Sequence, residues 1–559
     1  FRTIPILEVF HMRRKVRSGA IFLLCLLGLV AAGCSTNTEH FVNGPVTNPF
    51  LSAALYGITH FDPSQSDSTL YGPPRGTYRV SPETYPISFA GPVNIITLAS
   101  TNPSFMWGVG TDRVAYIRSS NGAWLEEARI EAPAYMAPTL GPVDPEFHRS
   151  IGERELEGMT SADLNALFVQ GYGQAYNLRI MNSSYSAVDN DNVLYANYGN
   201  GVYAFALADA SNPSAGISIV RSIADIRTIQ GAVVDGVRLF GLSMTYDGHL
   251  LVAFSNGLAV IDRSLDPATA QFVPFGAGET VNNSIAVDEK NGVYIATDKY
   301  MRKLVWTGTT LSTQESDGAW TSGYDAPTDA VPPMIKFGLG TGSTPTLMGF
   351  GTDPDKLVVI TDGCKRMKLV AFWRDEIPDG FVQKPGTASR RIAGQIQVTC
   401  GFSPLPEWIQ SEQSVVVNGY GAFVVNNLPE NAATYDIASA NKILGVAAMG
   451  PMYAPPTGAE RFEWDPDADE WRSVWTRSDV SSTSMVPIHS QSGNMALVNG
   501  YTAADGWEVT GMDWTTGETV HRTIFGRQTY GNGAYAILQY LKNGDLLFNS
   551  FVGPYRVSY

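Results

Sequence analysis

Strand-turn-strand units recur along this chain at uneven intervals. The clearest one runs from Val281 to Asp298. In it an apolar run, Ser284 to Val287, precedes a turn at Lys290-Asn-Gly, and Val293 to Ala296 forms a β-branched and aromatic return strand. Asn and Gly suit such a turn because both adopt positive φ at little cost. The pattern predicts a β-hairpin.

Comparable return strands occur in eight places. They begin at Val114, Val193, Leu250, Val293, Leu357, Ala422, Met495 and Leu546. Their spacing, roughly 40 to 80 residues, is too uneven for a solenoid of fixed rise but suits four-stranded blades joined by loops of variable length. We therefore predict an all-β fold, a β-propeller of four-stranded antiparallel blades over residues 93–559, with eight blades and with seven as the alternative.

Three segments interrupt this repeat, near residues 133–179, 317–344 and 428–457. The first contains a helical candidate for which Ser161 is the expected N-cap, and the other two are rich in Gly and Pro. Because inserted loops gather on the faces of a propeller, these segments could roof its central channel. Decoration without function is the alternative.

The amino-terminal region has the features of an export signal. Residues 1–11 precede Met12 and are interpreted as upstream read-through. Residues 12–34 are interpreted as a signal peptide whose apolar run, Ala20 to Val30, is too short to span a membrane comfortably. Residues 35–92, rich in Asn, Thr, Ser, Pro and Gly, are predicted to be a tether and lead-in.

The segment Val30-Ala-Ala-Gly-Cys34 resembles a bacterial lipobox, although Ala31 replaces the more usual Leu. The resemblance implies that Cys34 is acylated, so the membrane becomes a partner through a lipid anchor. Ser35 resembles an outer-membrane sorting signal, which makes the outer membrane the expected location. An ordinary secretory peptide with a chance cysteine is the alternative.

The composition is typical of a folded β-protein, and the net charge argues against one class of binding partner. Hydrophobic residues make up 44% and charged residues 16%, with 55 Gly and 33 Pro among 559 residues. The net charge of -15 argues against a nucleic-acid partner, because phosphate binding needs Lys and Arg. Apart from Cys34, the exported body would keep Cys364 and Cys400, which could form a disulfide or remain two unpaired buried thiols.

Two blade patterns resemble known propeller families. The hairpin from Met512 to Arg522 contains an Asp-x-x-Thr-Gly pattern that resembles the repeat of quinoprotein-type propellers. The stretches Asn283 to Asp288 and Asn291 to Asp298 resemble blades of the gluconolactonase and senescence-marker family. Both resemblances cover scattered pieces of the chain, so they imply the fold and not the reaction.

Candidate ligand-binding residues lie where inner strands would open onto the channel. Read in the register of the Val281 hairpin, these residues are Asn182, Asn283, Thr346, Glu412 and His489. In gluconolactonase-like propellers an Asn at the position of Asn283 is a metal ligand. The resemblance therefore implies calcium or another divalent metal, with Glu412 as an anionic ligand or general base. Capping of strand ends is the alternative role for all five residues.

The leading prediction is an envelope lipoprotein that binds a small molecule or an envelope protein at the channel mouth. The enzyme alternatives are a metal-dependent, lactonase-like hydrolase and a quinoprotein-like oxidoreductase, and the structural alternative is a scaffold of an envelope complex. The sequence does not decide whether the protein is catalytic. No spacing singles out a nucleophile among the histidines His60, His148, His249, His489 and His521.

Overall fold

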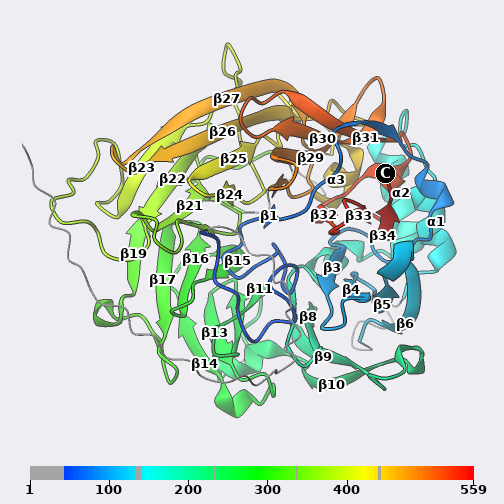
Figure 1. Ribbon diagram of the computed structural model, residues 1–559, viewed down its shortest axis with the longest axis horizontal. Coiled ribbons are helices and arrows are strands. Elements are labelled where there is room, and N and C mark those ends of the chain that lie inside the picture. The colour runs from blue at the N-terminus through cyan, green and yellow to red at the C-terminus, as the bar shows by residue number, and fades with distance from the viewer. Residues whose placement is uncertain (1–42, 134–141, 232, 335, 337, 438–441) are drawn as a thin grey trace, which may run out of the picture. The chain divides into compact units, whose positions relative to one another are not determined.

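The computed structural model describes residues 43–559 apart from 134–141, 232, 335, 337 and 438–441. The described chain is mostly β-structure, and its sheets follow one another around a central axis (Figure 1). Each successive sheet is a blade whose first strand lies innermost. The export signal, its Cys34 and the start of the predicted tether lie outside the described residues.

The first four blades come from residues 96–323. Blade 1 comprises β3 (Ile96–Ala99), β4 (Phe105–Val109), β5 (Arg113–Arg118) and β6 (Leu125–Glu131). Blade 2 comprises β7 (Ser186–Val188), β8 (Leu194–Tyr198), β9 (Gly201–Leu207) and β10 (Ile217–Ile223). Blade 3 comprises β11 (Leu239–Met244), β12 (Leu250–Phe254), β13 (Gly257–Ile261) and β14 (Gln271–Pro274). Blade 4 comprises β15 (Val281–Val287), β16 (Gly292–Thr297), β17 (Tyr300–Trp306), β18 (Leu311–Ser312) and β19 (Trp320–Gly323), the last two both pairing with β17.

The next three blades repeat this arrangement. Blade 5 comprises β20 (Thr346–Met348), β21 (Leu357–Thr361), β22 (Lys368–Trp373) and β23 (Ile392–Gln397). Blade 6 comprises β24 (Val416–Asn418), β25 (Gly421–Val425), β26 (Thr457–Asp465) and β27 (Glu470–Ser481). Blade 7 comprises β28 (Ile488–Ser490), β29 (Met495–Thr502), β30 (Gly506–Asp513) and β31 (Thr519–Gly526). It gains two parallel neighbours from the amino-terminal region, β1 (Ser68–Thr69) on β28 and β2 (Gly76–Arg79) on β31.

The eighth blade joins the two ends of the described chain. Its strands are β32 (Gln539–Tyr540), β33 (Leu546–Ser550) and β34 (Gly553–Val557). Ile87 forms an antiparallel bridge with Tyr555 of β34 and supplies the outer position of this blade. Gln539 donates a hydrogen bond of 2.8 Å from Nε2 to the Thr97 carbonyl of β3, so the last blade meets the first. The described residues thus form an eight-bladed β-propeller, which confirms the predicted fold class.

All eight predicted return strands are found, one in each blade. Seven lie on the second strand of their blade, and the one at Val114 lies on the third strand, β5, instead. The second strand of blade 1, Phe105–Val109, contains Gly108 and is not preceded by an Asp-containing turn like those of blades 2 to 5 and 8. The stronger local pattern at Val114 therefore shifted the prediction by one strand.

An aspartate at the end of the first strand fixes several of these hairpins. Asp288 accepts hydrogen bonds at Oδ1 from the Lys290 and Gly292 amides, and at Oδ2 from the Tyr294 hydroxyl at 2.7 Å. Asp189 binds the Asp191 and Val193 amides in the same way. Such carboxylates satisfy turn amides that would otherwise need water. Asp288 therefore has a structural role in its hairpin.

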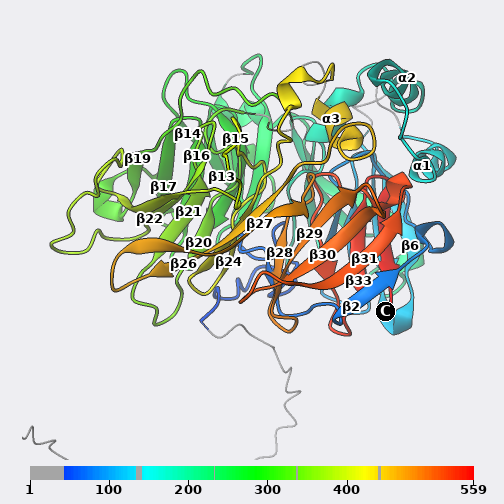
Figure 2. The same ribbon diagram turned by 90° about the horizontal axis from the view of Figure 1, so that it is seen from above.

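The three insertions lie on one face of the propeller. Strands of a blade alternate in direction, so the connections between blades and the loops between second and third strands share a face. Insertions 133–179 and 317–344 are blade connections, and 428–457 joins β25 to β26. They carry α1 (Pro145–Gly152), α2 (Ser161–Tyr172) and α3 (Lys442–Ala448), which Figure 2 shows together on one side. The N-cap of α2 is Thr160 rather than the predicted Ser161, because Thr160 and Asp163 form a capping box.

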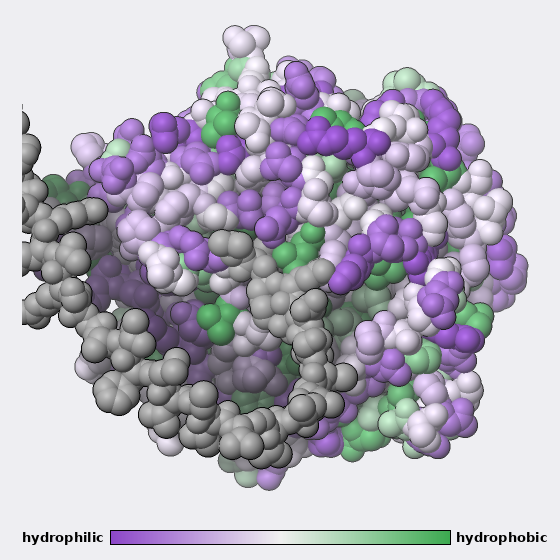
Figure 3. Space-filling view, viewed as in Figure 1, coloured by the Kyte–Doolittle hydropathy of each residue, from purple (hydrophilic) through white to green (hydrophobic). Residues whose placement is uncertain are grey.

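Apolar side chains from all three insertions form one buried cluster, which we call the cap. It includes Leu164 and Phe168 of α2, Met334 of the second insertion, and Leu444 of α3. It continues into Phe551 and Val552 of blade 8. On the opposite face, seen in Figure 3, the surface is mostly polar with small separate apolar patches. The insertions are therefore a packed layer of the fold rather than independent surface loops.

Residues 48–69, which we call the channel segment, line the inner strands on the side opposite the cap. Their carbonyls accept hydrogen bonds from inner-strand amides of four blades: Val287 to Pro63, Leu347 to Ser64, Val417 to Ser66, His489 to Asp67, and Gln491 to Thr69. Ile58 also forms a bridge with Ala187 of β7. Almost every side chain from Tyr56 to Thr69 is buried. This stretch is an ordered part of the fold and not the tether that its composition predicts.

Candidate functional site

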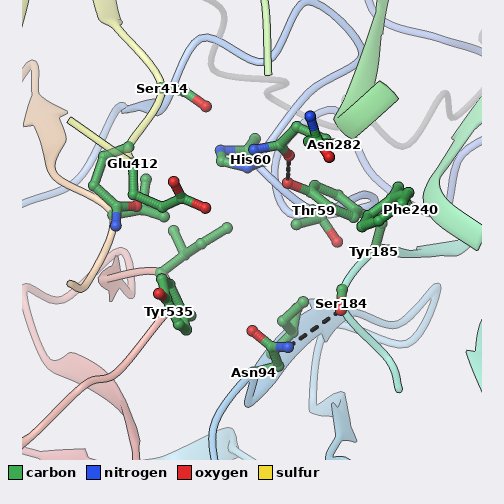
Figure 4. Close-up of a pocket in the computed structure, with 15 residues that line it drawn as sticks. Thr59, His60, Asn94, Ser184, Tyr185, Phe240, Asn282, Glu412, Ser414 and Tyr535 are labelled. Atoms are coloured by element: carbon green, nitrogen blue, oxygen red, sulfur yellow. Dashed lines mark hydrogen bonds between the residues drawn. The ribbon is translucent and has the colours of Figure 1, made fainter. Parts of the chain in front are cut away.

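A cavity of about 100 Å³ lies on the axis, where the inner strands begin. Its walls come from residues that precede or open the inner strands of seven blades, and its floor comes from the channel segment (Figure 4). The lining residues are Thr59, His60, Asn94, Ile96, Ser184, Tyr185, Phe240, Asn282, Asn283, Glu412, Gln413, Ser414, Val486, Tyr535 and Ile537. A space of this size holds several water molecules or one small organic ligand.

His60 is the floor residue with the most constrained side chain. Its Nδ1 lies 2.8 Å from Oδ1 and 2.9 Å from Oδ2 of Asp67, and both residues are buried. The imidazole stacks on the Tyr185 ring with centroids 5.8 Å apart. Because Asp67 engages Nδ1, the nitrogen that the ring can offer to the cavity is Nε2. Burial raises the pKa of Asp67, and the charge and hydrogen bond of His60 oppose that rise.

Four polar groups at the cavity have no hydrogen-bond partner among the described residues. They are Nε2 of His60, the side-chain amide of Asn282, Oε1 of Gln413 and the hydroxyl of Ser414. Polar groups in a protein interior are normally hydrogen-bonded, so four unpaired groups around one cavity indicate a bound ligand or ordered water. These groups come from the channel segment, blade 4 and the segment before blade 6, and they line the same space (Figure 4).

Backbone strain accompanies the cavity. The lining residues His60, Asn94 and Tyr535 have positive φ angles of 62°, 50° and 54°. Left-handed conformations cost energy for residues other than glycine and gather at sites where a side chain must be aimed. Each of these residues directs its side chain to the cavity wall or floor. The strain is consistent with a site selected for geometry.

The charge of the cavity excludes some ligands. Glu412 is the one carboxylate among the lining residues, which include no lysine or arginine. Burial, reinforced by the Glu412 charge, raises the pKa of Tyr535 well above its ordinary value, and burial with the same charge raises that of Tyr185. Both phenols are therefore neutral at physiological pH. An anionic ligand would find no cationic side chain in the lining.

The structure brings together two of the five residues that the sequence analysis selected. Asn283 and Glu412 line the cavity, whereas Asn182, Thr346 and His489 are buried elsewhere. Asn182 donates to the Thr111 carbonyl and accepts from the Gly199 amide, and Thr346 donates to the Val415 carbonyl. These two have the capping role named as the alternative.

His489 packs against Trp514 with ring centroids 4.5 Å apart. Burial lowers the pKa of His489 to about 3, so it stays neutral. Its backbone amide binds the channel segment at Asp67. His489 is thus a core residue of blade 7 and contributes packing rather than a ligand group.

Asn283 is fully engaged by the protein. Its Oδ1 accepts from the Tyr185 hydroxyl, from Thr344 Oγ1 at 2.8 Å and from the Ser284 amide at 2.9 Å. Its Nδ2 donates to the Gly342 carbonyl at 2.7 Å. A carbonyl oxygen has two lone pairs, so three donors leave none for a cation. The Asn283 and Glu412 pair therefore does not fit a divalent-metal site in this arrangement, and Asn283 positions Tyr185 instead.

Both cysteines of the folded body are free thiols, so the disulfide proposed between Cys364 and Cys400 does not form. Cys364 lies in the β21–β22 turn beside Asp325 and Asp362, with ligand atoms within 4.8 Å of one another. Lys368 forms ion pairs with both carboxylates, at 3.5 Å to Asp362. Burial also raises the pKa of Cys364 to about 12. Lys368 lies where a metal ion would have to bind, and its charge offsets part of the negative charge of the two aspartates.

His60 is the residue that sequence reasoning missed. Its role depends on Asp67, seven residues away, and on Asn282 and Ser414, which lie in other blades. Only the short spacing between His60 and Asp67 could have drawn attention to the pair. Five of the residues from 56 to 67 have positive φ, Tyr56, His60, Phe61, Gln65 and Asp67, a conformation that no local pattern indicates.

Asp62 gives the channel segment a measurable pH dependence. Burial, with a smaller contribution from Asp67, raises the pKa of Asp62 to about 6, against hydrogen bonds from Ser64 and Ser66. The folded state therefore holds its proton more tightly than the unfolded state, and stability falls as pH rises from 3.8 to about 6. Asp62→Asn should remove roughly 3 kcal/mol of this pH dependence between pH 4 and 7, measured by urea unfolding.

Asp191→Asn is the control for that experiment, because the Asp191 side chain is 77% exposed. Its stability curve should run parallel to that of the wild type. Parallel curves for Asp62→Asn as well would contradict a buried, titrating Asp62.

The part of the chain that the structure describes contains no helix long and apolar enough to cross a membrane. No family model matches the chain. An uncharacterised protein of Archaeoglobus fulgidus is 34% identical over 340 residues, which is 58% of this chain and 62% of that protein. The match thus spans less than two thirds of the relative's length.

Solved structures with similar folds share little sequence with this chain. Sqt1 of Saccharomyces cerevisiae has a TM-score of 0.42 and 9% identity, covering 87% of this chain and 99% of its own. The dihydro-heme d1 dehydrogenase NirN has a TM-score of 0.39 and 9% identity, covering 81% and 76%. A protein of Bacteroides fragilis assigned as a 6-phosphogluconolactonase has a TM-score of 0.35 and 10% identity, covering 76% and 92%. The fold assignment rests on the eight sheets and not on these similarities.

Fold and site together define a class: an eight-bladed β-propeller with a small axial cavity that is lined in part by the channel segment. The resemblance to quinoprotein-type and gluconolactonase blades extends to the propeller architecture, and membership of either family stays a prediction.

Proposed function

We propose that this protein binds a small, polar, uncharged molecule in the axial cavity. The observation that carries the proposal is the set of four unpaired polar groups, from His60, Asn282, Gln413 and Ser414, around a space of about 100 Å³. Apolar side chains, among them Phe240 and Ile537, complete the lining and would cover the less polar side of the ligand. The lining includes no lysine or arginine that would hold an anion, which favours an uncharged ligand.

The cellular setting is a separate proposal. The lipobox-like segment ending at Cys34 supports export and acylation, with the outer membrane as the location. Labelling of expressing cells with an alkyne fatty acid should tag the wild type and not a Cys34→Ala variant. An equally labelled variant would contradict the anchor.

Ligand binding can be tested with a panel of monosaccharides, polyols, small lactones and matched anionic analogues, using native mass spectrometry. At least one uncharged compound should bind the wild type, and Asn282→Ala should bind it about tenfold more weakly, the effect of losing one hydrogen bond. Since Asn282 has no hydrogen bond to the described residues, this variant should keep the stability of the wild type.

Asn212→Ala is the matched control, because Asn212 is an exposed residue before β10. It should bind the ligand like the wild type. A ligand that binds all three proteins equally would lie outside the cavity, and exclusive binding of anionic compounds would contradict the proposed ligand class.

A further inference from the structure

The contacts of His60 fix the orientation of its imidazole. A general base needs such a fixed orientation, whereas a histidine that only packs in the core does not. The carboxylate fixes Nδ1 from 2.8 Å, the Tyr185 ring covers one face of the imidazole, and the backbone at His60 has a φ of 62°. These three constraints fix the ring orientation and leave Nε2 as the basic atom at the cavity floor. A histidine needed only for packing requires neither the buried carboxylate nor the strained backbone.

Two further polar side chains without a hydrogen-bond partner line the same cavity. The Asn282 amide and the Ser414 hydroxyl have no partner among the described residues, and both line the space that His60 lines. Amide and hydroxyl donors of this kind stabilise an oxyanion when they are held in place before the reaction. Figure 4 shows His60, Asn282 and Ser414 on neighbouring sides of the cavity, with Glu412 across from Asn282.

We propose that the cavity is a hydrolytic site for small uncharged esters, in which His60 is the general base, Asp67 positions it, and Asn282 and Ser414 bind the carbonyl oxygen. This inference rests on the proposed function, because the substrate is the small uncharged ligand of the same cavity. Water is the second reactant. No metal enters the reaction.

The proposed hydrolysis begins with attack by water on the ester carbonyl. Nε2 of His60 takes a proton from water while the water oxygen bonds to the carbonyl carbon, and the carbonyl electron pair moves to the oxygen held by Asn282 and Ser414. When the carbonyl re-forms, the bond to the alkoxide breaks, and the alkoxide takes the proton back from Nε2. The products are an alcohol and a carboxylic acid. Asp67 accepts the hydrogen bond from Nδ1 and stabilises the imidazolium.

Hydrolysis of 4-nitrophenyl acetate by the purified full chain tests the proposal. His60→Gln should lose at least about a hundredfold in kcat/KM, the usual contribution of a general base. His249→Gln is the matched control, because His249 also pairs with an aspartate, with Nδ1 3.1 Å from Asp247, but lies in a turn of blade 3 outside the cavity. It should keep the rate of the wild type.

Ser414→Ala provides a second test that remains valid if the His60→Gln variant does not fold. Its hydroxyl has no partner among the described residues, so the fold should be unaffected while kcat falls at least about tenfold. Full activity in Ser414→Ala and His60→Gln, or an equal loss in His249→Gln, would overturn the proposal.

The positioning role of Asp67 is tested by a measurement that a purely structural residue would not affect. In a sample labelled with ¹⁵N histidine, the His60 resonances should show a protonated Nδ1 and a bare Nε2, and Asp67→Asn should shift this tautomer balance. A wild type that binds panel ligands but hydrolyses no ester would overturn the hydrolytic site and leave the binding function standing. A wild type that does neither would overturn both.

Discussion

A chain that begins at residue 71 is expected to lose most of the stability of the propeller. Without the channel segment, the inner-strand amides of Val287, Leu347, Val417, His489 and Gln491 lose their acceptors. Each buried unpaired amide costs about 1–3 kcal/mol, so the loss is on the order of 5 kcal/mol or more, against a typical total of about 5–15 kcal/mol. Burial of Ile58 and Phe61, each 1% exposed, is lost as well.

Thermal and urea unfolding of two truncated chains would measure this loss. A chain that begins at residue 43 keeps the whole channel segment and should unfold like the full-length protein. The chain that begins at residue 71 still contains β2 and Ile87, so blades 7 and 8 keep their outer strands. Equal midpoints for the two truncated chains would show that water replaces the channel segment without penalty.

Phe168→Ala is expected to open the cap while the blades stay folded. The Phe168 ring packs against Tyr172, Tyr176 and Phe551 with centroid distances of 5.4, 5.6 and 5.8 Å. Removing a buried aromatic ring costs about 3–5 kcal/mol, which corresponds to at least a hundredfold increase in local opening. Hydrogen exchange should therefore accelerate in α1, α2 and α3 and stay unchanged in the inner strands.

Gln170→Ala on the same helix is the control, because Gln170 is exposed and its replacement removes no buried contact. Its exchange pattern should match that of the wild type. Acceleration of the blades together with the cap in Phe168→Ala would show that the insertions and the propeller unfold as one unit. Faster ligand exchange in the same variant would identify the cap as the side from which the ligand enters.

The channel segment, near the amino terminus, contributes the floor of the axial cavity. The insertions 133–179, 317–344 and 428–457 pack as the cap on one face, and the channel segment forms the floor from the other. The floor supplies His60, while the walls supply the groups that would hold a ligand. The geometry of this cavity therefore depends on correct placement of a short segment near the amino terminus, and substitutions there should affect the proposed ligand binding as well as stability.

The sequence could predict the blades because their signals are local. Asp288, the Lys290-Asn-Gly turn and the Val293 to Ala296 strand lie within nine residues, and similar strand-turn-strand patterns recur along the chain. Asn283 and Glu412 could be selected because the repeat register places them at inner-strand starts. The same register selected Asn182, Thr346 and His489, whose side chains have other partners: Asn182 and Thr346 donate to backbone carbonyls, and His489 packs on Trp514 of its own blade. Register fixes a position along a strand but not which neighbour a side chain contacts.

The amino-acid sequence by itself predicted an all-β propeller of eight blades, with seven as the alternative, and the places where it is interrupted, because hairpins are encoded by period-two alternation and by turn residues a few positions apart. Only the tertiary structure showed where the channel segment lies and which residues line the cavity. Ser66 meets Val417, and His60 shares a cavity with Ser414, across more than 350 residues. Contacts at that separation, together with positive φ at His60 and Asp67, are set by ring closure and packing rather than by any local pattern.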